Sequence, residues 1–346
     1  MSEREAYRRA GVDVAAGEAA VERIRPLAER TFGPAVLGTL GGFAGAFRFA
    51  AGDYREPVLL AGCDGVGTKL AVAESVGDFS GIGQDLVAMC VNDVAAAGGR
   101  PLFFLDYLAT GRLEPERVET VVAGMARALE SIGCALLGGE MAEMPGFYPP
   151  GRMDLAGFCV GVCEQARLLG PERVRPGDAL VGLESSGVHA NGFSLLRRLV
   201  EERGLTYGDA LTGVGKLGEA LLRPTRVYVR ALEAMGSAGG LRAAAHITGG
   251  GWQGNVARVL PTGLTARVEL GSWPVPPLFG HIADWGGLGE ADMLATFNMG
   301  IGLVAVVDPA ALDASLAALR GVGETAHVVG RVVEGGEGVA FARAGA

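Results

Sequence analysis

Residues 62–69 read GCDGVGTK, and they follow an apolar run at 57–61 that predicts a buried strand. The three glycines allow positive φ values and a close approach of the backbone to a ligand. Successive exposed N–H groups in such a loop form a concavity that binds anions. Because the carboxylate of Asp64 would repel a phosphate, a divalent cation has to lie between them. The octapeptide therefore predicts a metal–nucleotide site at the end of a strand.

The lysine of this loop is rare in the chain, because only Lys69 and Lys216 are lysines among 30 Lys and Arg residues. A compact ammonium binds phosphate as a point charge, which a planar guanidinium does not reproduce. We therefore predict that Lys69 contacts phosphate, with chance placement as the alternative. The segment is close to a P-loop, but Thr68 precedes Lys69 and Asp64 lies inside the loop. This order excludes the Walker fold, but phosphate binding remains the predicted role of the loop.

Composition excludes several classes of protein. A chain of 346 residues suits two domains, and its 49% apolar residues suffice for buried cores. The net charge of −9 argues against a nucleic-acid partner. No apolar run approaches the ~18 residues that a membrane span needs, and no apolar signal core opens the chain, so we expect a cytoplasmic protein without a membrane partner. The five cysteines, without a C-x-x-C pair, indicate reduced core thiols, with a reactive Cys63 as the less favoured alternative.

Both halves of the chain mix strands with helices, which predicts an α/β (mixed α+β) protein. A cluster of proline, arginine and glycine at 167–177 marks a domain boundary, so we expect an N-terminal domain over 1–170 and a C-terminal domain over 171–346. The expected helices include 17–31, 81–98, 114–132, 193–203, 276–285 and 308–321, and the expected strands include 57–63, 101–109, 135–137, 153–164, 178–184, 264–270, 300–307, 327–333 and 338–342.

Three carboxylates are candidate metal ligands. Asp64 lies in the glycine loop, Asp93 lies on the apolar stripe of a predicted helix, and Glu140 follows a predicted strand beside two glycines. Mg²⁺ prefers a few carboxylates together with phosphate oxygens and water. Each residue alone could cap a turn or face solvent, but jointly they favour a metal site. Asp85 and Asp106 are weaker candidates.

Two glycine turns of the second half carry polar side chains. His189 and Asn191 lie at a strand-to-helix turn, where they could contact a ligand, although a lone histidine is as often a structural residue. His246 precedes the glycine turn 248–251, which leads into a predicted helix and could hold an anion.

Eleven segments, in order and over nearly the whole chain, match one family pattern. They are YRRAGVDVAAG (7–17), LGGFAG (40–45), DGVGTKL (64–70), GQDLVAMCVND (83–93), PLFFLDYLATG (101–111), GGEMAEMPGFY (138–148), AGFCVGV (156–162), SSGVHANGFSL (185–195), PTRVYV (224–229), HITGGG (246–251) and TFNMGIG (296–302). On these segments the chain resembles the phosphoribosylformylglycinamidine cyclo-ligase (AIR synthetase) family of de novo purine biosynthesis.

The resemblance implies a two-domain AIR-synthetase-like fold whose N-terminal strands form a barrel across a homodimer. It implies that ATP and Mg²⁺ bind in a cleft. The implied reaction is the ATP-dependent ring closure of formylglycinamidine ribonucleotide to 5-aminoimidazole ribonucleotide. The formyl oxygen is phosphorylated to an imidoyl phosphate, the amidine nitrogen attacks, and ADP and phosphate are released. Such phosphoryl transfer depends mainly on positioning and charge neutralisation.

The resemblance also implies roles for individual residues. Asp64, Asp93 and Glu140 would hold Mg²⁺, Lys69 would contact phosphate, and His189 would join these residues in the cleft. The implied catalytic set is Lys69, Asp64, Asp93 and His189. The implied nucleotide-binding set is Gly41, Gly42, Gly45, Asp64, Gly65, Gly67, Thr68, Lys69, Asp93, Glu140 and Asn191, with the glycine loop at 41–45 closing over the triphosphate.

Related ATP-using families fit less well. A selenophosphate synthetase would need a reactive Cys or selenocysteine near an N-terminal glycine loop, and no cysteine precedes Cys63. A hydrogenase-maturation dehydratase would end in a cysteine, whereas this sequence ends ARAGA. A thiamine-phosphate kinase would lack GGEMAEMPGFY and SSGVHANGFSL. A nucleotide-binding regulator without turnover is the alternative from another class, and the Asp64, Lys69 and Asp93 set argues against it.

Overall fold

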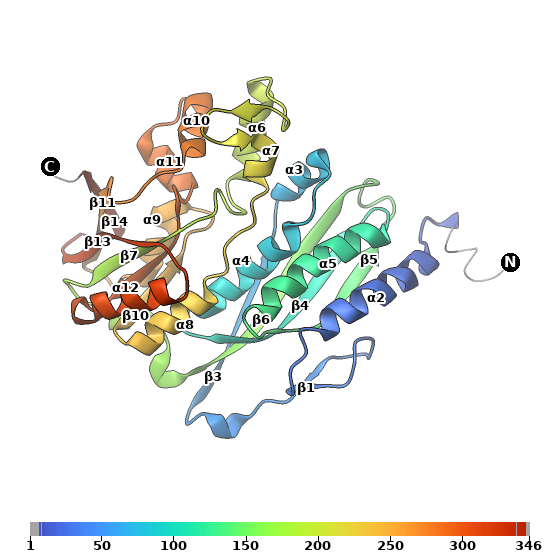
Figure 1. Ribbon diagram of the computed structural model, residues 1–346, viewed down its shortest axis with the longest axis horizontal. Helices are drawn as coiled ribbons and strands as arrows, with labels where there is room; N and C mark the ends of the chain where they lie inside the picture. The colour runs from blue at the N-terminus through green and yellow to red at the C-terminus, as the bar shows by residue number, and fades with distance from the viewer. Residues whose placement is uncertain (1–6, 8, 337, 344–346) are drawn as a thin grey trace. The chain divides into compact units, whose positions relative to one another are not determined.

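The computed structural model describes residues 7, 9–336 and 338–343 (Figure 1). The chain forms two compact units. One contains the residues up to Val94 with Pro101–Gln165, and the other contains Ala95–Arg100 with the residues from Ala166 onward. The units change between Gln165 and Ala166, whereas the composition predicted a boundary between 170 and 171. The ends of both predicted domains, 1–6 and 344–346, lie outside the described residues.

The first unit is built on a four-stranded sheet in the order β3-β6-β4-β5. β3 pairs antiparallel with β6, and β4 pairs parallel with β5. Within the described residues the sheet is open, with β3 and β5 at its edges, so one chain does not close a barrel. The elements are α2 (Val14–Glu29), β1 (Val36–Leu37), β2 (Ala46–Phe47), β3 (Pro57–Gly65), α3 (Lys69–Val76), α4 (Ile82–Ala96), β4 (Arg100–Thr110), α5 (Pro115–Glu130), β5 (Ala135–Glu143) and β6 (Met153–Glu164).

Helices cover one face of this sheet, with α2 beside α5 in front of the strands (Figure 1). α5 starts at Pro115, whose fixed φ suits the first helical position. Its apolar residues Val118, Val121, Val122 and Met125 recur every three or four positions and are buried. The helix period therefore supplies the apolar stripe that packs on the sheet.

The opposite face of the sheet is apolar and open. β3 alternates between exposed and half-buried positions, and Leu59 is 61% exposed. On the neighbouring strand Phe158 is 42% exposed, and it lies opposite Cys63. Exposed apolar side chains at this density are typical of a surface that another surface covers.

The second unit contains a six-stranded sheet in the order β10-β12-β7-β13-β11-β14. Its pairs are antiparallel except for β11 with β14. β12 is buried along its whole length, and its side chains form one core with Trp252 and Trp273. The elements are β7 (Ala179–Glu184), α6 (Phe193–Glu202), β8 (Ala210–Leu211), β9 (Gly215–Lys216), α7 (Leu217–Leu221), α8 (Val229–Ala238), β10 (Leu241–His246), α9 (Gly251–Val256), β11 (Leu264–Leu270), α10 (Pro277–Gly286), α11 (Glu290–Thr296), β12 (Ile301–Val307), α12 (Leu312–Gly321), β13 (Ala326–Glu334) and β14 (Gly338–Arg343).

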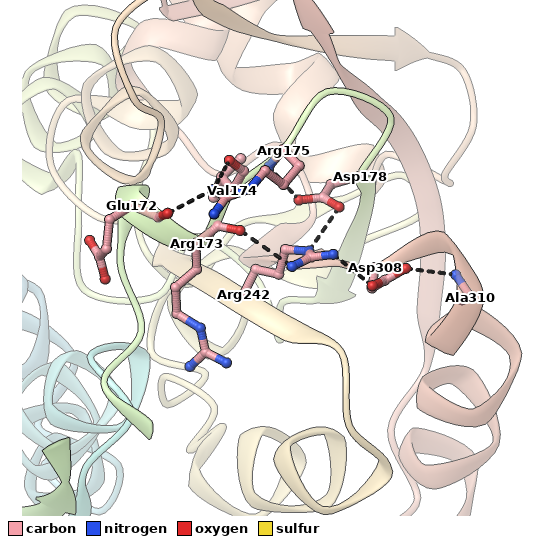
Figure 2. Close-up of polar contacts among 8 residues, drawn as sticks. All are labelled: Glu172, Arg173, Val174, Arg175, Asp178, Arg242, Asp308 and Ala310. Carbon is pink, nitrogen blue, oxygen red and sulfur yellow. Dashed lines mark hydrogen bonds and ion pairs between the residues drawn. The ribbon is translucent and has the colours of Figure 1, made fainter. Parts of the chain in front are cut away.

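Arg242 of β10 joins two acidic residues of this second unit, as Figure 2 shows. Its Nε lies 3.0 Å from Oδ1 of Asp178, and its Nη2 lies 2.6 Å from Oδ2 of Asp308. Asp178 also accepts a hydrogen bond from the backbone amide of Arg175, at 2.7 Å. Burial raises the pKa of Asp178, and Arg242 opposes this rise. The network therefore neutralises a buried carboxylate at the start of β7.

The predicted elements agree closely with the structure where local patterns are strong. The strand predicted at 264–270 is confirmed as β11, and the helix predicted at 81–98 is confirmed as α4. The prediction for β5 is wrong at its end, because the strand continues past residue 137 to Glu143. No helix in the described part of the chain is long and apolar enough to cross a membrane.

Candidate functional site

The glycine loop at the end of β3 leads directly into α3. Gly65 ends the strand, Gly67 has a φ of +66°, and Lys69 is the first residue of α3. Asp64 accepts a hydrogen bond from the amide of Gly65 at 2.7 Å, which holds its carboxylate against the turn. Thr68 is exposed just before the helix. The strand predicted before the loop is present as β3, but the prediction that it is buried is wrong, because its residues alternate between exposed and half-buried positions.

Lys69 is fully buried and pairs with Asp85 of α4. Its Nζ lies 2.9 Å from Oδ1 and 2.8 Å from Oδ2 of Asp85, and neither side chain is exposed. Burial lowers the pKa of Lys69, and the charge of Asp85 opposes this. The pair joins the first turns of α3 and α4. Asp85, which the sequence ranked as a weak metal candidate, is thus the counter-ion of the loop lysine.

Asp64 and Asp93 come from adjacent elements. A side chain on Gly62 would place its Cβ 4.0 Å from Cβ of Asp93, and the carbonyl oxygen of Asp64 lies 4.0 Å from Sγ of Cys90. The end of β3 therefore lies against the second half of α4, which carries Asp93. Asp93 is exposed, although the helix pattern placed it on the apolar stripe.

Glu140 does not join these two carboxylates in the structure. It lies within β5, at the opposite edge of the sheet from β3, and it is exposed. The two edge strands are three strand spacings apart, roughly 14 Å. Among the described residues, no group of three His, Cys, Asp or Glu side chains is close enough to hold a metal ion. Asp64 and Asp93 remain a two-carboxylate set, which is enough for Mg²⁺ when phosphate oxygens complete the coordination.

The glycine loop before β2 packs on β5. A Cβ on Gly45 would lie 2.5 Å from Cγ of Leu137, so only glycine allows this approach. Gly41 has a φ of +114°, and Arg25 donates a hydrogen bond to the neighbouring carbonyl of Leu40 at 2.6 Å. Phe43, at the tip of the loop, is fully exposed. Gly42 completes this loop, which the sequence predicted to close over a triphosphate.

This loop forms one wall of a cavity of about 1070 Å³ in the first unit. The other walls come from α2, α5, β2, β4, β5 and Phe158 of β6, and most of the lining side chains are apolar. Asp106 and Glu140 provide its carboxyl groups. Burial raises the pKa of Asp106 to about 7. Sequence reasoning named Asp106 only as a weak candidate, because nothing in its apolar strand indicates a cavity.

His189 and Asn191 belong to the second unit and lie on the turn after β7. His189 is buried with a φ of +60°, and its Nε2 lies 3.3 Å from the amide of Ser186. Its ring lies 6.2 Å from that of Tyr228, which lies 6.4 Å from the ring of His246. The structure thus places both histidines predicted from the glycine turns around one buried tyrosine.

Two buried asparagines form hydrogen bonds to the glycine turns. Neither was predicted from the sequence. Asn255 donates to the carbonyl of Gly251 at 2.7 Å. Asn298 donates to the carbonyl of Gly187 at 2.9 Å, and its Oδ1 accepts from Ser185 at 3.1 Å. Their only sequence signal was an amide residue inside an apolar or glycine-rich segment.

Family models match both units of the chain. The model described as AIR synthase related protein, N-terminal domain, matches residues 46–163, and the C-terminal domain model matches residues 175–343. The chain therefore has the two-domain architecture of the AIR-synthase-related proteins.

Curated relatives define the family more narrowly. Proteins named phosphoribosylformylglycinamidine cyclo-ligase are 53% identical in Sorangium cellulosum (96% of each chain) and 54% identical in Gloeobacter violaceus (97% of this chain, 99% of the relative). The chain belongs to the phosphoribosylformylglycinamidine cyclo-ligase family, a family of ligase enzymes of purine biosynthesis.

Solved structures support the fold. The thiamine-monophosphate kinase from Stenotrophomonas maltophilia has a TM-score of 0.70 at 21% identity, covering 93% of this chain and 95% of the kinase. The hydrogenase maturation protein HypE from E. coli has a TM-score of 0.66 at 22% identity, covering 92% of each chain. At this identity the likeness concerns the fold alone.

Proposed function

We propose that the chain catalyses the ATP-dependent ring closure of formylglycinamidine ribonucleotide to 5-aminoimidazole ribonucleotide, with release of ADP and phosphate. The observation that carries this proposal is the roughly 50% identity, over nearly the full chain, to relatives named for this activity. Structural neighbours described in complex with ATP, or with AMPPCP and TMP, support nucleotide binding on this fold.

The proposed step transfers the γ-phosphoryl group of ATP to the formyl oxygen, giving an imidoyl phosphate and ADP. The amidine nitrogen then bonds to the imidoyl carbon, the carbon–oxygen bond breaks, and phosphate leaves with that oxygen. Asp64 and Asp93 would hold Mg²⁺, which supplies charge neutralisation for the phosphates. The loop of Gly41, Gly42 and Gly45 would cover the triphosphate.

Lys69 requires a more specific proposal, because its ammonium is enclosed with Asp85. A phosphate contact would need Nζ to turn away from Asp85 or to share its protons with both partners. In the described state the pair fixes the start of α4, whose second half carries Asp93. We therefore assign Lys69 first to holding the loop and α4 together, and second to phosphate.

We also propose that the open apolar face of the first sheet pairs with a second copy and closes a barrel across a homodimer. The exposure of Leu59 and Phe158 supports this. Leu59→Lys would place a charge on this face and is expected to shift the dimer to monomer in sedimentation velocity, whereas Leu37→Lys, an exposed position on β1, serves as a control. A dimer that survives Leu59→Lys would contradict this interface.

The activity is tested with purified protein, ATP, Mg²⁺ and formylglycinamidine ribonucleotide labelled with ¹⁸O at the formyl oxygen. The proposal expects the aminoimidazole product, and it expects the label in the released phosphate. Product without label in phosphate would contradict the imidoyl phosphate. Substrate-independent release of phosphate without ring closure would contradict the assignment as a cyclo-ligase.

A further inference from the structure

Asp106 is a carboxyl group in a largely apolar cavity. It lies on β4, opposite Gly139 of β5. A Cβ on Gly139 would lie 2.3 Å from Oδ1 of Asp106, so the glycine makes room for the carboxyl group between the strands. Among the described residues, no Lys, Arg or His forms an ion pair with Asp106, and burial raises its pKa to about 7. The carboxyl group accepts a hydrogen bond from the backbone amide of Asp106 itself. Because a carboxyl group has two oxygens, it keeps capacity for further hydrogen bonds to a ligand in the cavity.

The other residues that line the cavity limit which kind of ligand can bind there. Its lining contains no lysine, arginine or histidine among the described residues, so it offers no counter-charge to a phosphate or carboxylate. Its apolar walls include Val21, Ile24, Leu105 and Leu136. Such walls suit a planar, weakly polar group, and the cavity of about 1070 Å³ is large enough for a nucleotide-sized ligand.

A carboxyl group has a specific complement in an amidine, the N–C–N unit with one donor and one acceptor nitrogen. A protonated carboxyl group donates one hydrogen bond and accepts another, which matches a neutral amidine. A carboxylate accepts two, which matches an amidinium. The same two parallel hydrogen bonds form in either case, and only the position of the proton differs.

We propose that this cavity binds an amidine group of a ligand, with Asp106 as its partner through two hydrogen bonds. The proposal rests on the proposed function, in which two ligands carry this chemistry. The formylglycinamidine substrate has an open amidine, and the adenine of ATP has the same N–C–N unit, formed by its exocyclic amino group, C6 and the ring nitrogen N1. Glu140, the second carboxyl group of the cavity, is exposed and provides a polar rim.

Calorimetric titration of the full chain with two matched pairs of ligands tests the proposal and separates the two sources. The first pair is the amidine ribonucleotide and its amide analogue, in which oxygen replaces the imino nitrogen. The second pair is ATP and ITP, because the hypoxanthine base of ITP lacks the exocyclic amino group. We expect the wild-type protein to prefer the amidine member of one pair by at least about tenfold, an effect typical of hydrogen bonding to a charged or buried partner.

Asp106→Leu is expected to abolish that preference. Loss in the first pair assigns the cavity to the substrate, and loss in the second assigns it to adenine. Asp106→Asn keeps the shape, and it should retain affinity only for a neutral amidine, because an amide cannot neutralise an amidinium. Asp313→Asn, on the exposed surface of α12, is the matched control.

The proposal is overturned if the wild-type protein prefers neither amidine, or if both Asp106 variants keep the wild-type preference. Far-ultraviolet circular dichroism establishes that each variant is folded, and Asp106→Ala, which likewise lacks both hydrogen-bonding groups, takes the place of the leucine variant if that variant is not. Failure of ring closure in the wild-type protein would contradict the proposed function but leave these ligand preferences measurable, so the two failures are distinguishable.

Discussion

The two units neutralise a buried carboxylate in different ways. In the first unit, Lys69 and Asp85 form an ion pair with neither side chain exposed. In the second unit, Arg242 reaches two carboxylates at once, and its own side chain is 26% exposed. The charges of an enclosed pair lose their hydration and are stabilised only by protein groups. A partly exposed guanidinium keeps contact with water. Losing one charge should therefore reduce stability more at the Lys69–Asp85 pair than at the Arg242 network.

Breaking the enclosed pair should have the largest effect. Asp85→Asn removes the negative charge that Asp85 places beside the buried ammonium of Lys69, and we expect a loss of about 3–5 kcal/mol in the free energy of unfolding. Chemical denaturation measures this loss. The double variant Lys69→Met with Asp85→Asn should recover much of it, because no buried charge remains. A loss below about 1 kcal/mol in the single variant would show that Lys69 finds water or another partner.

Removing the shared arginine should cost less. Arg242→Gln leaves Asp178, which is almost fully buried, with the hydrogen bond from the amide of Arg175 as a remaining partner. We expect a loss of about 2 kcal/mol in the free energy of unfolding, typical of hydrogen bonds to charged groups. Equal losses for Arg242→Gln and Asp85→Asn would contradict the contrast between the two units.

Asp106 extends the comparison to a carboxyl group that forms no ion pair with any described residue, and it should make stability depend on pH. Burial raises the pKa of Asp106 from its ordinary value of 3.8 to about 7 in the folded protein. Between these values the folded state binds more protons than the unfolded state, so stability falls as pH rises from about 4 to about 7 and this contribution then levels off. Melting temperatures of wild type and Asp106→Asn at pH 5 and pH 8 check this. The variant should gain relative stability at pH 8, and a constant difference between the proteins would contradict the shift.

The smallest effect is expected at an exposed pair. Arg343 and Glu290 lie 3.4 Å apart with side chains 75% and 53% exposed. Arg343→Gln should change the free energy of unfolding by less than about 0.5 kcal/mol, since water screens both charges. The same denaturation assay measures it. A loss of unfolding free energy comparable to that of Arg242→Gln would mean that side-chain exposure does not predict how much each ion pair contributes to stability.

Much of the fold was predictable because it follows from short-range patterns. Asp308 and Pro309 predicted a helix start, and the structure shows Asp308 accepting a hydrogen bond from the amide of Ala310 at 2.9 Å. The continuous apolar run at 300–307 predicted the buried strand β12. The end of β5 was missed because its glycines have weak strand propensity, and pairing with β4 stabilises them in the strand.

The candidate site was predictable in part. The glycine loop, Asp64 and Lys69 were evident, because the residues needed for phosphate chemistry lie within eight positions. The grouping of Asp64 with Asp93 was expected from the pattern of three candidate carboxylates and from the family resemblance. The partner of Lys69 was not predicted, because Asp85 lies sixteen residues away on another helix. The separation of Glu140 from Asp64 depended on strand order, which no local pattern reveals.

The amino-acid sequence alone determined the family, the alternation of strands and helices, and the glycine loops, because each depends on residues close together in the chain. The tertiary structure decided which charges are buried, which face of the first sheet stays open, and that Asp106 lines a largely apolar cavity. These properties depend on contacts between distant segments, and burial changes the energy of a charge more than any neighbour in the sequence does.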